Sequence, residues 1–389
     1  MFSARVAADL RPNRLAQALE ARRRAGAPIL DLTLSNPTRA GLEYPPDLLV
    51  PLADRRGLIY EPAPLGLEEA RAAVAREFAR RGRVVDPHRI ALVASTSEAY
   101  SLLFKLLADP GDEVLVPRPS YPLLEYLTAL DAVIARPYDL EYHGVWSIDL
   151  AALEAAVGPR TRAVVVVHPN NPTGSFVSAA EADRLERLCR DHGMAVIADE
   201  VFADYVLEPD ARPASPAAGR GALAFALGGL SKSVGLPQAK LAWIAVDGPD
   251  DLVERAIARL ELICDTYLSV STAVQLAAPR LLEQGATVRG RIAGRISANY
   301  ERLKELSRAA PASRVLRADG GWYAILQVPA FEPEEDLVVG LLARDGVLVH
   351  PGYFFDFPGG SHLVLSLLPP EETFAKAVSI VMARSTRGG

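Results

Sequence analysis

The sequence predicts an α/β fold in which a mostly parallel sheet lies between layers of helices, joined to a smaller α+β unit. Two observations support this prediction. Short apolar segments alternate with helical patterns from about residue 45 to 270, as expected for strands covered on both faces. After about residue 275 the pattern changes to one long helix followed by short strands. We therefore predict a large domain of residues 36–274 and a small domain of residues 1–35 and 275–389.

The large domain contains a series of predicted strands, each an apolar segment with few charges. They occupy residues 90–95, 113–117, 163–169, 194–199, 222–227 and 241–246. Helices lie between them, such as 178–193, where Ser178 and Glu181 form a capping box and Gly193 ends the helix. Ligands of such sheets bind beyond the carboxyl ends of the strands, so the residues after each strand are the candidates for chemistry.

The small domain begins with a helix predicted over roughly residues 285–308. A strand at 321–328, a helix near 333–344 and strands at 347–350 and 363–368 follow it. We expect the N-terminal segment to complete this unit.

Composition argues against several classes of function. The net charge is −6 and the charges are interspersed, so no nucleic-acid partner is expected. Cys189 and Cys264 are too few for a disulfide framework or a zinc site, and we expect both to be core thiols. No signal-peptide pattern is present, and no apolar segment approaches the ~20 residues of a membrane helix. We therefore expect a soluble cytoplasmic protein without a metal.

Polar side chains follow two of the predicted strands. Ser95 and Glu98 form a capping-box pattern that starts a helix, and the free N–H groups and hydroxyls of Thr96 and Ser97 can bind a phosphate. An ordinary helix cap is the alternative. The stretch NNPTG, residues 170–174, predicts a tight turn whose asparagines can also donate hydrogen bonds to a ligand.

Charged side chains follow two further strands. Asp199 ends a buried strand and needs a partner, either a protonated ring nitrogen or a neighbouring Arg or Lys. Lys232 and Lys240 lie in GLSKSVGLPQAK, residues 229–240. Lys232 can lose its proton if it is desolvated or near a cation, and a lysine that extends to the surface is the alternative. A phosphate cradle, an amide, a carboxylate and an amine are together the parts that hold pyridoxal phosphate (PLP).

On these motifs the sequence resembles the fold-type I PLP enzymes of the class I/II aminotransferase family over nearly the whole chain. NNPTG, the Asp-Glu pair at 199–200, and SK followed by GLP occur in the family's order. The resemblance implies an aminotransferase with a small-molecule amino donor and keto acceptor, working as a homodimer with shared active sites. A PLP-dependent lyase, decarboxylase or cyclase, and a non-catalytic PLP-binding protein, are the alternatives.

The resemblance also implies a role for each matching residue. Lys232 would form the Schiff base and later carry a proton, and Asp199 would pair with the pyridine nitrogen. Asn171 would bind the 3-oxygen of the ring, and Tyr121 in RPSYP would stack on the ring. The phosphate would be held by Thr96, Ser97, Ser231, Lys240 and, across the dimer interface, Tyr60.

Several positions depart from the family pattern. Ser95 stands in place of the usual glycine. Phe202 stands in place of a tyrosine that donates to the ring oxygen, so we expect a shifted pKa for the Schiff base. Lys240 replaces an arginine, which keeps the charge but loses the bidentate fork.

The largest departure is Val364, which aligns with an arginine that clamps the substrate's α-carboxylate. Either another residue binds this group or the substrate lacks it. The candidates are Arg39, which we rank first, Asn36 beside it in SNPTRAG, His350 and His362. We expect a fairly apolar substrate, since aromatic residues are available to line the mouth, unless they belong to the core or the dimer interface: Tyr121, Trp322, Tyr323, Tyr353, Phe354 and Phe355.

Overall fold

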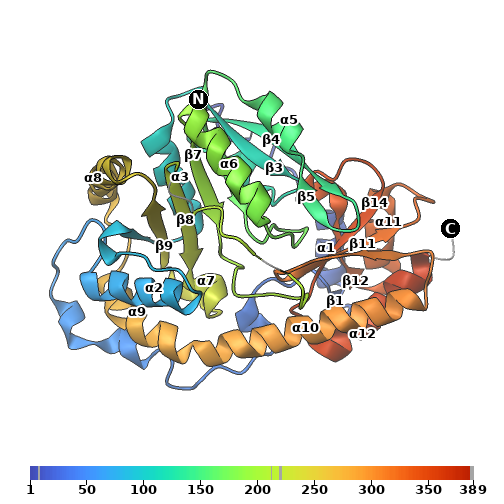
Figure 1. Ribbon diagram of the computed structural model, residues 1–389. Helices are drawn as coiled ribbons and strands as arrows, with labels where there is room; N and C mark the ends of the chain where they lie inside the picture. Colours follow the sequence, from blue (N-terminus) through green and yellow to red (C-terminus); the bar gives the residue numbers. More distant parts are fainter. Residues whose placement is uncertain (8, 212, 219–220, 386–389) are drawn as a thin grey trace.

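A computed structural model of the chain describes all residues except 8, 212, 219–220 and 386–389. Its largest element is an eight-stranded sheet with the order β2-β9-β8-β7-β6-β3-β4-β5 (Figure 1). The strands are β2 (Ile90–Val93), β3 (Glu113–Arg118), β4 (Ile134–Tyr142), β5 (Trp146–Ile148), β6 (Thr161–Val167), β7 (Ala195–Asp199), β8 (Ala224–Gly229) and β9 (Ala242–Asp247). All the predicted strands of the large domain are present.

The sheet is mostly parallel, as predicted. β4, β3, β6, β7 and β8 run parallel to one another. β9 is antiparallel to both of its neighbours, and β5 is antiparallel to β4. The sequence did not predict β4, because only two of its nine residues are buried and one of the others is Pro137. A strand so exposed has no continuous apolar segment to predict it.

Helices cover both faces of this sheet because successive residues of a buried strand point to opposite sides. In β6, Val165 packs into a core shared with Leu103 of α3 and Leu260 of α8. Its neighbour Val164 packs into the other core, together with Leu185 of α6. Figure 1 shows α6 in front of the strands. The helices of this region are α2 (Glu68–Arg80), α3 (Thr96–Leu107), α4 (Leu123–Leu130), α5 (Leu150–Ala156), α6 (Ala179–His192), α7 (Leu230–Ser233), α8 (Asp250–Tyr267) and α9 (Thr272–Gln284).

The second unit is a four-stranded antiparallel sheet with the order β10-β11-β14-β13. The N-terminal segment contacts this part of the chain through a separate two-stranded sheet, in which β1 pairs in parallel with β12. The elements of this unit are α1 (Arg14–Arg24), β1 (Leu30–Asp31), α10 (Ala286–Arg308), β10 (Arg314–Leu316), β11 (Tyr323–Val328), α11 (Glu334–Gly340), β12 (Val347–Leu348), β13 (His350–Pro351), β14 (Ser361–Ser366) and α12 (Glu371–Ser385). The division of the chain at residues 35/36 and 274/275 stays a prediction.

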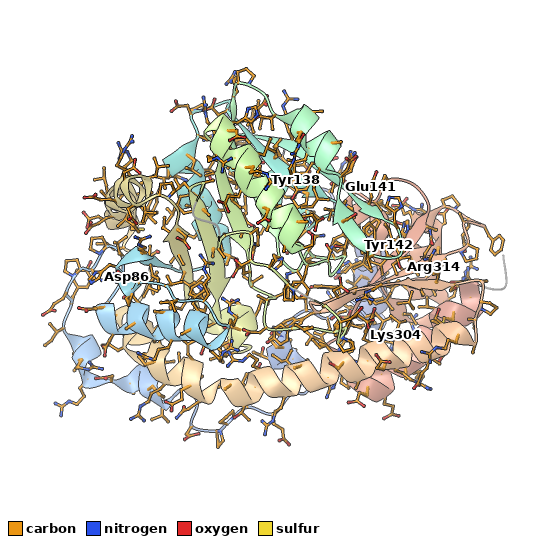
Figure 2. The ribbon with its side chains drawn as sticks, viewed as in Figure 1. Asp86, Tyr138, Glu141, Tyr142, Lys304 and Arg314 are labelled. Atoms are coloured by element: carbon orange, nitrogen blue, oxygen red, sulfur yellow. The ribbon has the colours of Figure 1, made fainter. Side chains whose placement is uncertain are left out.

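Side chains join the edge of the large sheet to the small sheet. The hydroxyl of Tyr142 in β4 accepts a hydrogen bond of 3.0 Å from the backbone N–H of Arg317. The guanidinium of Arg314 in β10 lies 5.3 Å from the centre of the Tyr142 ring (Figure 2). Below them in Figure 1, α10 extends from α9 toward α12 along both units. These contacts hold the two sheets against each other.

The start of α3 differs in one detail from the predicted capping box. Ser95 accepts a hydrogen bond of 3.1 Å from the N–H of Glu98, as expected. The carboxylate of Glu98 accepts from the N–H of Ala94 rather than from that of Ser95. The box is therefore half formed, and Glu98 stabilises the end of the preceding strand. At α6 both halves of the predicted box are present, and Gly193 ends that helix at φ 64°.

Candidate active site

A cavity of about 370 Å3 lies between the large sheet and the small sheet. Its lining includes Lys232, which follows β8, Asp199 at the end of β7, and Asn171, which follows β6. Of the site residues predicted from the sequence, the cavity brings together Thr96, Ser97, Tyr121, Asn171, Asp199, Lys232 and His350. All of them except His350 lie at or just beyond the carboxyl ends of strands of the large sheet, where a doubly wound sheet binds ligands, whereas His350 begins β13 of the small sheet.

Lys232 lies in the four-residue helix α7 between β8 and a short turn. Its carbonyl accepts a hydrogen bond from the hydroxyl of Tyr205, which fixes the backbone. Its Nζ lies 4.8 Å from the ring centre of Trp322 and 5.5 Å from that of Phe202. Burial among these rings lowers the pKa of Lys232 to about 8, although the nearby Asp199 opposes the shift. The uncharged amine is therefore accessible near neutral pH.

The turn after Lys232 depends on Gly235, which has φ +67°. A side chain there would be strained, and its Cβ would lie 2.9 Å from the hydroxyl oxygen of Tyr44. That hydroxyl donates a 2.7 Å hydrogen bond to the Gly235 carbonyl. The glycine in GLSKSVGLP therefore lets the chain turn tightly behind the lysine.

Asp199 is a buried carboxylate with two donors. The N–H of Val201 and the hydroxyl of Tyr100 donate to its two oxygens, each at 3.1 Å. Desolvation raises the pKa of Asp199 to about 6, while both hydrogen bonds and the charge of Lys232 act to lower it. The group is still mostly ionised at pH 7, so the cavity holds a buried negative charge that a cationic ring nitrogen can balance.

Two further parts of the lining are suited to a polar ligand. Asn171 is buried, and its Oδ1 has no hydrogen-bond partner among the described residues. Thr96 and Ser97 are the first residues of α3, where backbone N–H groups lack partners within the helix. The carboxylate, the lysine of lowered pKa and the helix N-terminus all fit PLP, so the chemistry of this lining agrees with that cofactor.

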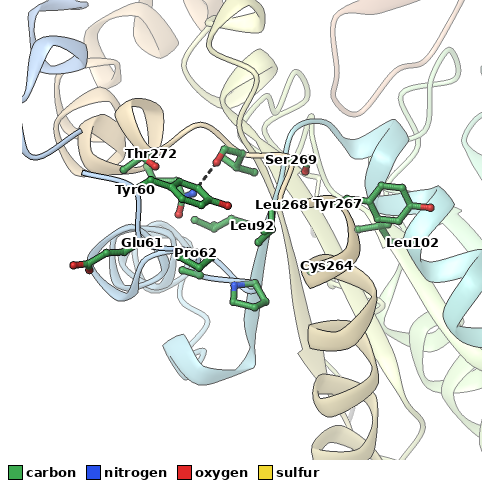
Figure 3. A pocket seen from close by; sticks show the side chains of 15 residues that line it. Tyr60, Glu61, Pro62, Leu92, Leu102, Cys264, Tyr267, Leu268, Ser269 and Thr272 are labelled. Atoms are coloured by element: carbon green, nitrogen blue, oxygen red, sulfur yellow. Dashed lines mark hydrogen bonds between the residues drawn. The ribbon is translucent and has the colours of Figure 1, made fainter. Parts of the chain in front are cut away.

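Three residues predicted to bind the phosphate do not line this cavity. Ser231 precedes Lys232 in α7 and is partly buried. Lys240 is exposed and has φ 53° at the end of its turn. Tyr60 is 69% exposed and lines a separate small pocket with Tyr267 and Leu268 (Figure 3). Their roles at the phosphate stay predictions.

The four candidates for substrate binding lie in different surroundings in the structure. Arg39 is exposed, and the side chain of Asn36 accepts hydrogen bonds of 3.0 and 2.7 Å from Thr38. His362 stacks on Phe357, with ring centres 4.7 Å apart. Among these four, His350 lines the cavity.

The aromatic residues expected at the mouth divide in a similar way. Tyr121, Tyr323, Phe354 and Phe355 line the cavity, as does Phe202. Trp322 is fully buried in the core, and Tyr353 lines a different pocket. Of the aromatic residues expected to line the mouth, Trp322 therefore belongs to the hydrophobic core instead.

Tyr100 was missed by the sequence analysis, although its hydroxyl contacts Asp199. It lies four residues after Thr96 on α3, so both residues share one face of the helix. That spacing is the signal that could have identified it.

The described residues contain no group of three or more His, Cys, Asp or Glu side chains that could hold a metal ion. Within the same residues, no helix combines the length and the apolar character that crossing a membrane requires. Both cysteines are buried, as expected.

Known proteins resemble this chain over most of its length. The family model of class I and II aminotransferases matches residues 46–379. Alanine aminotransferase of Mycobacterium tuberculosis is 30% identical over 372 residues, covering 91% of this chain and 84% of the relative. Glutamate-pyruvate aminotransferase of Escherichia coli is 28% identical over 360 residues, covering 88% and 87%.

Solved structures agree with these sequence relatives. The crystal structure of an aminotransferase from Escherichia coli superposes with a TM-score of 0.86 at 25% identity, covering 100% of this chain and 98% of that one. A single mutant of Thermus thermophilus aspartate aminotransferase has a TM-score of 0.84 at 26% identity, covering 99% of each chain. The similarity therefore includes both sheets and the cavity between them.

Proposed function

The chain belongs to the class I and II aminotransferases, which are PLP-dependent enzymes, and we propose that it transfers an amino group between an amino acid and a 2-keto acid through Lys232. The observation that carries the residue assignment is the meeting of Lys232 and Asp199 in one cavity. Relatives named for alanine and for glutamate and pyruvate make these compounds the first substrates to test.

PLP, Lys232 and Asp199 each have a separate role in the proposed reaction. PLP supplies an aldehyde carbon that takes the amino group and a ring that withdraws electrons from the substrate's α-carbon. Lys232 Nζ would hold the cofactor and, when released, would take the proton from the substrate's α-carbon, a role that its lowered pKa favours. Asp199 would keep a proton on the ring nitrogen by its negative charge.

Other residues of the lining would orient the cofactor. The amide of Asn171 would bind the oxygen of the ring, and the ring of Tyr121 would cover one face of the cofactor. Thr96 and Ser97 would bind the phosphate at the N-terminus of α3. Phe202, which has no hydroxyl, leaves Asn171 as the side chain proposed to contact the ring oxygen.

We further infer a cytoplasmic homodimer. Tyr60 is 69% exposed and lies outside the cavity of its own chain, so its side chain is free to reach the cofactor site of a second copy. Ser231 and Lys240 would complete the phosphate site. Sedimentation of the purified protein tests the dimer directly, and a single species of monomer mass would contradict it.

The two half-reactions test the proposed function. Protein loaded with PLP is mixed with L-alanine alone, and we expect pyruvate and pyridoxamine phosphate in equal amounts. Added 2-oxoglutarate should then restore PLP and produce glutamate. Release of carbon dioxide or ammonia in place of this exchange would instead indicate a decarboxylase or a lyase.

Tyr100 is predicted to support Asp199. Tyr100→Phe removes one donor from a buried carboxylate, so the pKa of Asp199 should rise and its ionised form should be less favoured. Loss of one such hydrogen bond predicts a decrease in kcat/KM of about 2- to 10-fold and faster loss of PLP on dialysis. Tyr126→Phe, which changes an exposed tyrosine in α4, serves as the matched control. Equal PLP retention in the two variants would contradict the role of Tyr100.

A further inference from the structure

The face of β14 that turns to the cavity is defined by its pairing with neighbouring strands. Directly opposite residues of antiparallel strands place their side chains on the same face of the sheet. Tyr323 in β11 is opposite Ser366, and His350 in β13 is opposite Val364. Both Tyr323 and His350 line the cavity, so this face of the small sheet borders it. Val364 itself is buried and apolar and cannot bind an anion.

The charges around the cavity are few. Among its lining residues, the side chains that can be charged near neutral pH are Asp199, Lys232 and His350. The first two are assigned to the cofactor and to proton transfer. An amino acid brings a carboxylate into the cavity, and a buried carboxylate without a partner is costly. His350 is the remaining side chain of this lining that can carry a positive charge.

The surroundings of His350 in the described part of the chain leave one of its ring nitrogens without a hydrogen-bond partner. Its ring packs against Phe354 and Phe355, with ring centres 6.1 and 5.9 Å away. Nδ1 is buried and has no hydrogen-bond partner among the described residues. Buried polar atoms are almost always satisfied in native proteins, so an unsatisfied ring nitrogen beside a cavity indicates a missing partner.

We propose that His350 binds the carboxylate of the amino acid substrate and thereby determines which amino donors the enzyme accepts. The inference rests on the proposed function, because an amino acid donor supplies that carboxylate. The amino group of the substrate then lies at Lys232 in α7 and its carboxylate at His350 in β13. An imidazole offers one hydrogen bond here, where a guanidinium would offer two in parallel.

The proposed contact between His350 and the substrate's carboxylate should depend on pH, because the imidazole can be protonated. Burial lowers the pKa of His350, and the carboxylate of Asp31 opposes the shift. Titratable groups on the elements around it and across the cavity are Asp31, Tyr100, Tyr121, Asp199, Lys232, Tyr323, Glu334, Glu335, Asp336, Tyr353 and His362. Glu334 is engaged by the N–H groups of Tyr353 and His362. The free imidazole is therefore neutral near pH 7, and a bound carboxylate favours its protonated form. Substrate binding should take up a proton.

The test compares two donors that differ in one group, L-alanine and its neutral amide, L-alaninamide. His350→Phe in the PLP-loaded enzyme should raise the KM for L-alanine about 10- to 100-fold, because a hydrogen bond to a charged group is lost. His350→Gln, which keeps an N–H donor but cannot be protonated, should raise it less. The KM for L-alaninamide should change much less. His143→Gln, at an exposed histidine of the turn between β4 and β5, is the control and should change neither value. The visible PLP band and the melting temperature show whether each variant is folded and loaded.

A second measurement determines how many protons the enzyme takes up when a ligand binds. Binding of 2-methylalanine, which has no α-proton to lose, is measured by calorimetry in two buffers of different ionisation enthalpy. Loss of the ligand's ammonium proton and displacement of Lys232 occur in both proteins, so the wild type should take up more protons per ligand bound than His350→Gln. The affinity of the wild type should also decrease more with rising pH than that of His350→Gln.

Several outcomes would overturn the assignment. Equal effects of the His350 variants on alanine and alaninamide would mean that the side chain shapes the cavity without binding the carboxylate. A large rise in KM in Arg39→Ala, with no change in the His350 variants, would place the carboxylate at Arg39. In both cases transamination still proceeds, so the role of His350 would be wrong while the proposed function would stand. If no amino acid exchanges its amino group with PLP, the proposed function fails, and the inference fails with it.

Discussion

Lys232→Ala is expected to reduce transamination at least ~100-fold, and to prevent covalent attachment of PLP. Lys232 is the proposed nucleophile and proton carrier, and no other lysine lines the cavity among the described residues. The expected result is measured as a single turnover with L-alanine, together with borohydride reduction and peptide mapping. The wild type should carry a pyridoxyl group on Lys232, and the variant should carry none while still binding PLP through the remaining contacts.

Lys232→Arg is the matched control for charge. Arginine keeps the positive charge but does not lose its proton at working pH, so it cannot move a proton from the α-carbon. The two variants should therefore be similarly inactive. Normal turnover in either variant, or a wild-type label on Lys240, would show that the assignment of Lys232 is wrong.

Asp199→Asn should produce the second-largest effect, a decrease in kcat of about 100- to 1,000-fold, as for the loss of one preorganised electrostatic contact. The asparagine has nearly the same shape. Its oxygen can accept from the N–H of Val201 and its NH2 group can donate to the hydroxyl oxygen of Tyr100, so the fold should be kept. It lacks the charge that holds a proton on the ring nitrogen. Steady-state rates with L-alanine and 2-oxoglutarate measure the change, and near-normal rates would contradict the role.

The pH dependence of cofactor binding provides a further check on Asp199. Its pKa is raised to about 6, so the carboxylate is present above that pH and is lost as the pH falls through it. PLP affinity in the wild type should therefore decrease below about pH 6 more steeply than in Asp199→Asn. The difference between the two titrations isolates this carboxylate, because every other group is shared. Parallel titrations would show that Asp199 does not contribute.

The central part of the fold could be predicted from the sequence because its strands are buried on both faces. β6 is apolar over residues 163–167 and β7 over residues 195–198, and the polar residues that lie in the cavity are Asn171, which follows β6, and Asp199, which ends β7. β4 could not be predicted, because most of its side chains are exposed or partly exposed and it has no apolar segment. The sequence therefore predicts strands that are fully buried and does not predict a strand that is largely exposed to solvent.

Single site residues were harder to predict where the answer depends on strand register. His350 and His362 lie on neighbouring strands, and the sequence offered both as candidates. The pairing of His350 with Val364 places it at the cavity, whereas His362 pairs with Gln327 and stacks on Phe357. Likewise Arg39 follows cavity residue Ser35 closely in sequence yet is exposed. Neither outcome can be deduced from local sequence, because both depend on long-range packing.

The cavity draws its reactive residues and its proposed recognition residue from different sheets. Lys232 and Asp199 follow strands of the large sheet, whereas His350 and Tyr323 belong to the small sheet. Related enzymes can therefore evolve a new substrate specificity through changes in the small sheet while the reaction stays the same. A chimera that exchanges the C-terminal third between two relatives should keep the reaction of one parent and have the substrate specificity of the other.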